Sequence, residues 1–253
     1  YGLAIRSRTA AVNASILPKM LETADSTERS VKSTGVKAPL MIMRGDGGVM
    51  SCDEMRKRPI LSMMSGPTAS VVGALMYLRA SVGIYFEVGG TSTNIGVIKN
   101  GRPSIRHTEL AGHRTYVNSL DVRVLGVAGG SMVRASGNKL IDVGPRSAHI
   151  AGLAYSTFAD PEDIVDPELY FVTPKEGDPS DYVAIKCSNG KKYTITNTCA
   201  ANVLGLTSPE YYAYGNRESA TKAMKPLADY LNVSVEECAR MILSKACSKL
   251  IPV

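Results

Sequence analysis

Tryptophan is absent from the 253-residue chain, and phenylalanine occurs only 3 times. Lysine and arginine exceed the acidic residues and give a net charge of +6, but the basic side chains are scattered along the sequence. Nucleic-acid-binding surfaces combine clustered basic residues with aromatic platforms. The composition therefore argues against a nucleic-acid partner.

The 5 cysteines are odd in number and include no Cys-x-x-Cys pair, which argues against a disulfide framework or a zinc ribbon. No apolar run reaches the roughly 20 residues of a membrane span, and no secretory leader opens the chain. We expect reduced, mostly buried thiols in a cytoplasmic protein with no membrane partner. Because the chain begins at Tyr1 and ends abruptly at residues 250–253, we also expect a piece of a longer polypeptide.

Residues 84–98 read as a strand, a polar turn and a second strand, and the turn consists of Gly89, Gly90, Thr91, Ser92 and Thr93. Adjacent glycines let a ligand approach the backbone closely, and the three hydroxyls add further hydrogen-bonding groups. Phosphate oxygens suit such a turn. An ordinary hairpin is the alternative, and the local pattern alone does not decide between them.

A second loop repeats this chemistry after an alternating strand that begins near residue 120, and it consists of Gly129, Gly130 and Ser131. Two such loops are difficult to explain as coincidental turns, because each is expected to leave backbone amides accessible and to add a hydroxyl. Asp121, at the start of that strand, is a candidate to hold a cation or to orient the loop.

A further candidate is Asp46, which follows the apolar run 39–43. Such a run predicts a buried strand, and ligands often bind at the carboxyl ends of strands in open α/β sheets. A simple turn aspartate is the alternative reading.

The remaining pattern alternates helices with strands. It predicts helices at residues 10–31, with a possible kink at Pro18, and at 68–78, 219–231 and 234–250. It also predicts a strand over 103–110 and a hairpin over 182–196, preceded by an acidic, proline-containing excursion too dispersed for a calcium loop.

The order of these motifs resembles the hydantoinase A/oxoprolinase family, including N-methylhydantoinases. The resemblance covers about residues 6–155 and resumes near 194, and it is carried by Asn13-Ala14 with Pro18, Asp46-Gly47-Gly48, Ser65-Gly66-Pro67 with Gly73-Ala74, Gly89-Gly90-Thr91-Ser92, Gly129-Gly130-Ser131, Val143-Gly144-Pro145 with Ser147-Ala148, and Thr194-Ile195-Thr196-Asn197. It implies an α/β, ribonuclease-H-like domain of the actin, sugar-kinase and heat-shock-chaperone ATPase superfamily, with a mixed sheet flanked by helices.

The resemblance also implies ATP and Mg²⁺ as cofactors. Glu87 and Asp46 would be catalytic, Glu87 and Asp121 would bind metal, and the two glycine loops would bind the nucleotide. The implied reaction opens a cyclic amide, of the hydantoin or oxoproline class, by phosphorylation of the carbonyl oxygen. A related carboxylase subunit acting on a carbonyl compound is also implied, as are missing flanking domains of the same polypeptide and a possible second subunit.

Several positions depart from the family pattern, among them Gly45 in place of a serine, residues 149–153 in place of a Gly-Pro-rich run, and three that concern carboxylates. Glu87 and Asn94 replace the aspartates that usually begin and end the strand motif, and Asn197 replaces a third aspartate. A glutamate still reaches a magnesium-bound water, whereas an asparagine supplies no charge and acts as no base.

These departures leave alternatives open: a nucleotide-binding regulatory or assembly subunit without turnover, or a plain structural fragment. We expect the 253-residue piece alone to be inactive. Along the chain we expect a family core at 1–157, the acidic excursion and hairpin at 158–193, and a helical return to the same core at 194–253.

Overall fold

The computed structural model describes residues 2–79 and 81–251, which form two compact units. The first unit takes in the described residues up to Glu87 together with Asn94–Arg123, and the second takes in Val88–Thr93 and the residues from Val124 onward. The chain therefore changes unit twice within the hairpin that carries the first glycine turn. The division into residues 1–157, 158–193 and 194–253 stays a prediction.

The first unit begins with the long helix α1 (Leu3–Ser33), which starts seven residues earlier than its apolar spacing predicts and contains Pro18. It packs on β7 (His113–Leu120), on the 3-10 helix η1 (Pro59–Ser62) and on α2 (Cys52–Lys57). Ser51 caps α2, because its hydroxyl accepts a hydrogen bond from the Glu54 amide at 3.2 Å.

The strands of the first unit form three small sheets. Strands β1 (Met41–Met43) and β2 (Val49–Ser51) form one antiparallel pair, and β6 (Ile105–Leu110) and β7 form another. The predicted hairpin is confirmed as β3 (Gly83–Val88) and β4 (Thr93–Lys99), which are joined by β5 (Arg102–Pro103) and β8 (Val122–Leu125).

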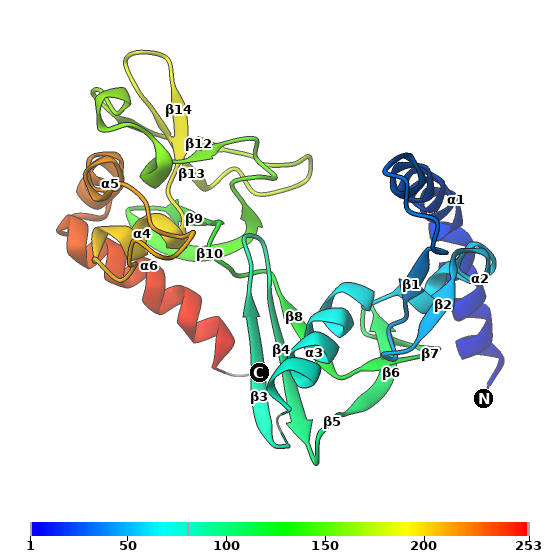
Figure 1. Ribbon diagram of the computed structural model, residues 1–253. Helices are drawn as coiled ribbons and strands as arrows, with labels where there is room; N and C mark the ends of the chain where they lie inside the picture. The colour runs from blue at the N-terminus through cyan, green and yellow to red at the C-terminus, as the bar shows by residue number, and fades with distance from the viewer. Residues whose placement is uncertain (1, 80, 252–253) are drawn as a thin grey trace. The chain divides into compact units, whose positions relative to one another are not determined.

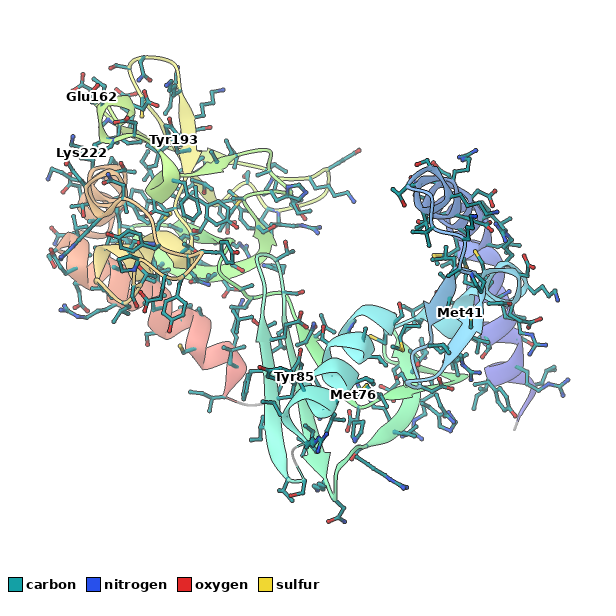
Figure 2. All side chains as sticks on the ribbon, viewed as in Figure 1. Met41, Met76, Tyr85, Glu162, Tyr193 and Lys222 are labelled. Atoms are coloured by element: carbon teal, nitrogen blue, oxygen red, sulfur yellow. The ribbon has the colours of Figure 1, made fainter. Side chains whose placement is uncertain are left out.

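Helix α3 (Ser65–Leu78) covers this third sheet. Its buried Val71 packs against Leu120 and Val122, and Tyr85 of β3 lies against the same cluster (Figure 2). The alternating burial of β3, in which every second residue is exposed, follows from having a helix on one face of the strand.

The second unit is built on a six-stranded sheet in the order β10-β9-β13-β14-β11, with β12 paired to β13. The strands are β9 (Ser131–Ser136), β10 (Lys139–Ser147), β11 (Ala154–Tyr155), β12 (Glu168–Val172), β13 (Tyr182–Lys186) and β14 (Lys192–Thr194). Strands β11 and β14 run parallel and the other pairs run antiparallel. The predicted α/β class with a mixed sheet and flanking helices is therefore confirmed.

Helices α4 (Asn197–Val203), α5 (Arg217–Leu231) and α6 (Val235–Leu250) pack beside one another against this sheet (Figure 1). Short 3-10 helices, η2 (Ser156–Phe158) and η3 (Pro161–Asp163), connect β11 to the strands that follow. Thr196, Asn216 and Ser234 cap the three α-helices through their side chains. The helix predicted at 234–250 is confirmed as α6, and its side chains of Ala239, Ile242 and Ala246 are buried.

The cysteines follow the expectation of free thiols. All five are unpaired, and only Cys247 is exposed. Within residues 2–79 and 81–251, no helix has the length and apolar character needed to cross a membrane.

Candidate functional site

The two glycine loops of the second unit are joined by backbone hydrogen bonds. The Gly129 amide donates to the Gly89 carbonyl at 3.1 Å, and the Gly130 amide donates to the Gly90 carbonyl at 2.8 Å. The loops therefore form one structure rather than two independent turns, although the bonded glycines are 40 positions apart along the chain.

The second loop is itself tied down by hydrogen bonds. The Ser131 amide donates to the Ala128 carbonyl at 3.1 Å, and the Ser131 hydroxyl accepts from the Ala128 amide at 2.8 Å. The expectation that this loop leaves its amides accessible is wrong, because all three amides of Gly129, Gly130 and Ser131 already have protein acceptors. The second loop therefore supports the first.

The first loop keeps its donors. Among the described residues, no protein atom accepts a hydrogen bond from the amides of Gly90, Thr91 or Ser92. The Thr91 hydroxyl shares a hydrogen bond with the Ser147 hydroxyl at 3.1 Å, so one of the two can turn to a ligand oxygen at small cost. Successive open amides beside hydroxyls are the donor set that an anion such as phosphate requires.

The predicted Thr93 has a different role. It is 1% exposed, and its hydroxyl donates to the Val127 carbonyl. This contact fixes the start of β4 against the segment before the second loop, so Thr93 holds the turn in place and directs no free hydroxyl to a ligand.

Two side chains of helix α4 form hydrogen bonds to backbone carbonyls at the second loop. The Asn197 amide nitrogen donates to the Ala128 carbonyl at 2.8 Å, and the Thr198 hydroxyl donates to the Gly129 carbonyl at 2.9 Å. A charged aspartate at position 197 would present only acceptors to that carbonyl. The replacement of the family's acid by Asn197 therefore has a structural reason in this chain.

Tyr155 is the residue of this site that the sequence reasoning missed. A Cβ atom on Gly130 would overlap the Tyr155 hydroxyl and would lie 2.6 Å from the Gly90 carbonyl oxygen, so only glycine fits at position 130. Burial raises the pKa of Tyr155, which keeps its hydroxyl a donor at neutral pH. No sequence signal marked it, because its place depends on the parallel pairing of β11 with β14.

Glu87 belongs to the first unit, where side chains hold its carboxylate. Asn94 donates its amide nitrogen to Glu87 Oε2 at 2.7 Å, and the Tyr85 hydroxyl donates to the same oxygen at 3.2 Å. The Asn94 hydrogen bond lowers the pKa of Glu87 against the opposing effect of burial. A charged carboxylate of this kind is a suitable oxygen ligand for a hard cation such as Mg²⁺.

The other two predicted acids are held separately. Asp46 pairs with Arg44 and accepts from the Gly48 amide at 3.1 Å, whereas Asp121 pairs with Arg106 at 3.0 Å. Within the described part of the chain, no group of three or more His, Cys, Asp or Glu side chains is placed to hold a metal ion. The catalytic and metal-binding roles of these acids stay predictions.

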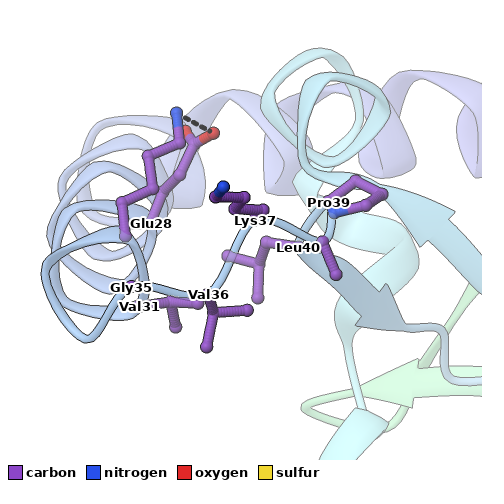
Figure 3. A pocket seen from close by; sticks show the side chains of 9 residues that line it. Glu28, Val31, Gly35, Val36, Lys37, Pro39 and Leu40 are labelled. Atoms are coloured by element: carbon purple, nitrogen blue, oxygen red, sulfur yellow. Dashed lines mark ion pairs between the residues drawn. The ribbon is translucent and has the colours of Figure 1, made fainter.

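Two other cavities are not lined by the open amides of the first loop. A small apolar one of about 260 Å³ lies behind the loops, between Gly129, Asn197 and Leu243. Another, of about 660 Å³, lies between the end of α1 and the following turn (Figure 3). There Glu28 and Lys32 form an ion pair at 3.0 Å, and Lys37 adds a further positive charge to the lining.

The Hydantoinase/oxoprolinase family model matches residues 6–251. The chain belongs to this family. The alpha subunit of caprolactamase from Pseudomonas jessenii is 30% identical over 148 residues, which cover 56% of this chain and 21% of that subunit. The resemblance inferred from the ordered motifs is thereby confirmed.

Two solved structures have a similar fold. The nucleotide-free acetone carboxylase, from work on ATP-dependent acetone carboxylation, superposes with a TM-score of 0.64 at 21% identity and covers 90% of this chain and 29% of its own. The ATP-dependent caprolactamase from Pseudomonas jessenii gives a TM-score of 0.59 at 23% identity, with 94% and 31% covered. The chain therefore spans less than a third of the length of these relatives.

Proposed function

We propose that this chain is the phosphate-binding part of an ATP-dependent enzyme that opens a cyclic amide. The observation that carries the proposal is the set of open amides at Gly90, Thr91 and Ser92, held against the second loop. Donors fixed before the ligand arrives need no reorganisation during phosphoryl transfer, whose catalysis rests on positioning and electrostatics.

The substrate class follows from the relatives. Hydantoin, oxoproline and caprolactam are all cyclic amides, and the names of the family and of the matched subunit refer to them. When bound, ATP supplies a phosphoryl group that activates the carbonyl oxygen of such a ring. A ketone-activating carboxylase is the second possibility within this scheme, but the acetone carboxylase likeness concerns the fold alone.

In this proposal the two glycine loops, Tyr155 and Glu87 each have a separate role. The turn from Gly89 to Ser92 binds phosphate oxygens, and Gly129 to Ser131 keep that turn in shape. The Tyr155 hydroxyl, which lies against Gly90 and Gly130, orients a ligand oxygen at the turn. Glu87, whose lowered pKa keeps it charged, holds a Mg²⁺-bound water.

A second candidate function is a nucleotide-binding subunit without turnover. It is favoured by Asn94 and Asn197, because both are hydrogen-bond donors to protein oxygens where the family pattern has acids. In this case nucleotide binding would regulate assembly with a partner subunit, such as the one implied by the name caprolactamase subunit alpha.

Binding of the nucleotide is tested on the 253-residue chain with Thr91→Val, which keeps the shape of the side chain and removes its hydroxyl. We expect about a tenfold weaker binding of Mg²⁺-ATP in calorimetry, as for the loss of one hydrogen bond to a charged group. Thr221→Val is the matched control, since the Thr221 hydroxyl only bonds back to Arg217 on α5. Equal weakening by both variants would contradict the phosphate-binding turn.

Turnover is tested on the intact polypeptide, with any partner subunit that copurifies. Phosphate release from ATP is followed with hydantoin, 5-oxoproline and caprolactam, and the ring-opened products are identified by mass spectrometry. Stimulation by one of these amides supports the enzyme. Nucleotide binding without stimulation by any of them supports the subunit without turnover.

A further inference from the structure

A pocket of about 720 Å³ lies in the first unit, and none of the glycine-loop residues lines it. One face of α1 forms its first wall, since Arg6, Thr9, Ala10 and Asn13 recur at helical spacing. Ile60 and Leu61 of η1 and two residues of β7 close the other sides. Ligand pockets hold roughly 300–1,000 Å³, so the size suits a small organic molecule.

Hydrogen bonds fix these walls to one another. Asn13 Oδ1 accepts from the Ile60 amide at 3.1 Å, which ties α1 to η1. The Thr9 hydroxyl accepts from the Tyr116 amide at 2.8 Å, which ties α1 to β7. The pocket is therefore formed in advance and does not depend on a ligand to assemble it.

The charge of the lining has one sign. Arg6 and Arg58 contribute guanidinium groups, and no acidic residue lines the pocket. Among the described residues, neither arginine forms an ion pair with a carboxylate, whereas the neighbouring Arg56 is paired with Asp25, Glu28 and Asp53. Two uncompensated guanidinium groups at an apolar pocket indicate an anionic ligand.

The floor of the pocket and its remaining donors identify the kind of anion. Ile60, which is 4% exposed, and Val117, which is 7% exposed, are apolar and favour a hydrocarbon body. A guanidinium pairs with a carboxylate or a phosphate through the same planar pair of donors. Phosphate sites often add backbone amides, but the amides of Ile60 and Tyr116 already donate to α1, which favours a carboxylate.

We propose that this pocket binds a small organic carboxylate, with its apolar body on Ile60 and Val117 and its head group between Arg6 and Arg58. The proposal stands apart from the phosphate-binding turn, because every residue that carries it belongs to the first unit. Failure of one proposal would leave the other intact.

The probe is hexanoate, titrated into the 253-residue chain labelled at isoleucine, leucine and valine methyl groups. We expect saturable shifts of the Ile60, Leu61 and Val117 methyl signals in carbon-proton correlation spectra. Hexanamide has the same hydrocarbon body without the charge. We expect its affinity to be at least about tenfold lower than that of hexanoate, because it loses an interaction with a charged group.

Variants locate the site. Arg6→Gln and Arg58→Gln are each expected to weaken hexanoate binding about tenfold. Arg102→Gln, at an exposed arginine of β5 outside the pocket, should leave it unchanged. Ala10→Leu fills the pocket and should abolish the shifts, whereas Ala11→Leu, at the next exposed alanine of α1, should not. Circular dichroism establishes that each variant keeps its helices.

Three results would overturn the proposal. Equal affinity for hexanamide would mean that the pocket selects only an apolar body. Binding of inorganic phosphate to the same residues as tightly as hexanoate would assign a phosphate site. Unchanged hexanoate binding in folded Ala10→Leu would place the ligand elsewhere on the chain.

Discussion

Asn94 donates its amide nitrogen to Glu87 Oε2 at 2.7 Å, across the two strands that flank the glycine turn. An aspartate in place of Asn94 would bring two carboxylates to this distance, and they would repel each other. Because Glu87 carries a charge here, the amide at position 94 stabilises that charge as a donor. The two departures from the family's acidic pattern, Glu87 and Asn94, therefore complement each other as acceptor and donor.

We therefore expect Asn94→Asp to lower the free energy of unfolding near pH 7 by about 1 kcal/mol, after allowance for solvent screening of a partly exposed pair. The new carboxyl also raises the pKa of Glu87, so the loss should diminish as the pH falls and one acid becomes protonated. Urea denaturation at pH 7 and pH 4.5 measures both effects.

The control for this variant is Asn100→Asp, which makes the same change on an exposed turn between β4 and β5. It should have little effect at either pH. Full native stability of Asn94→Asp at pH 7 would mean that the Asn94 hydrogen bond does not determine the charge of Glu87.

Gly130→Ala is expected to destabilise the second unit by about 1–3 kcal/mol or more, because the added methyl group meets the Tyr155 hydroxyl and the Gly90 carbonyl. Tyr155→Phe should restore only part of this loss, since the Gly90 carbonyl oxygen remains 2.6 Å from the new Cβ. Thermal unfolding of the single and double variants measures the coupling. Gly83→Ala, at a glycine with open space around it, should be close to neutral, and equal losses at both glycines would contradict the close approach.

Local pattern was sufficient to predict the first glycine turn, because the strands and the turn lie within the short stretch from Gly83 to Lys99. The same pattern misjudged the second loop, where tertiary pairing with Gly89 and Gly90 takes up the amides. Tyr155 could not be found from sequence, since a parallel strand pair brings it to Gly130. Local chemistry thus predicted a phosphate-binding turn, and long-range pairing decided which loop keeps its donors.

The start of helix α1 is a second feature that the local sequence pattern predicts incorrectly. Its apolar spacing predicted a start near residue 10, but the helix begins at Leu3. The additional turns carry Arg8 and Thr9, which bond to Arg114 and Tyr116 of β7. Contacts with a strand more than 100 residues away along the chain therefore stabilise helical turns that the local apolar spacing does not predict.

The segment between β12 and β13 carries a pH-dependent contact. Asp178 accepts two hydrogen bonds from Arg146, both at 2.8 Å, and this guanidinium lowers the pKa of Asp178. A carboxyl whose pKa is lower in the folded state stabilises that state fully above its unfolded pKa, and the stabilisation is lost as the pH falls through the folded value.

Asp178→Asn should therefore lower the melting temperature at pH 7, and the difference from the native chain should shrink as the pH falls below about 4, the usual range of aspartate. Differential scanning calorimetry across this range measures it. Glu176→Gln, in the same segment and without an ion pair among the described residues, should show no such convergence. A difference that stays constant with pH would assign the effect to packing rather than to charge.

Asn197→Asp tests the hydrogen bond from α4 to the Ala128 carbonyl at the second loop. Two effects on stability oppose each other in this variant. A negative charge at the first residue of α4 gains about 0.3–1 kcal/mol from the helix dipole. The carboxylate removes one of the two hydrogen bonds that the Ala128 carbonyl accepts, leaving the one from the Ser131 amide, and sets a buried charged acceptor against that carbonyl, which costs about 1–3 kcal/mol. We expect net destabilisation at pH 7, measured by urea denaturation, and weaker nucleotide binding, measured by calorimetry. Asn138→Asp, on an exposed turn, is the neutral control. A stabilised Asn197→Asp variant would mean that the helix dipole outweighs the lost hydrogen bond.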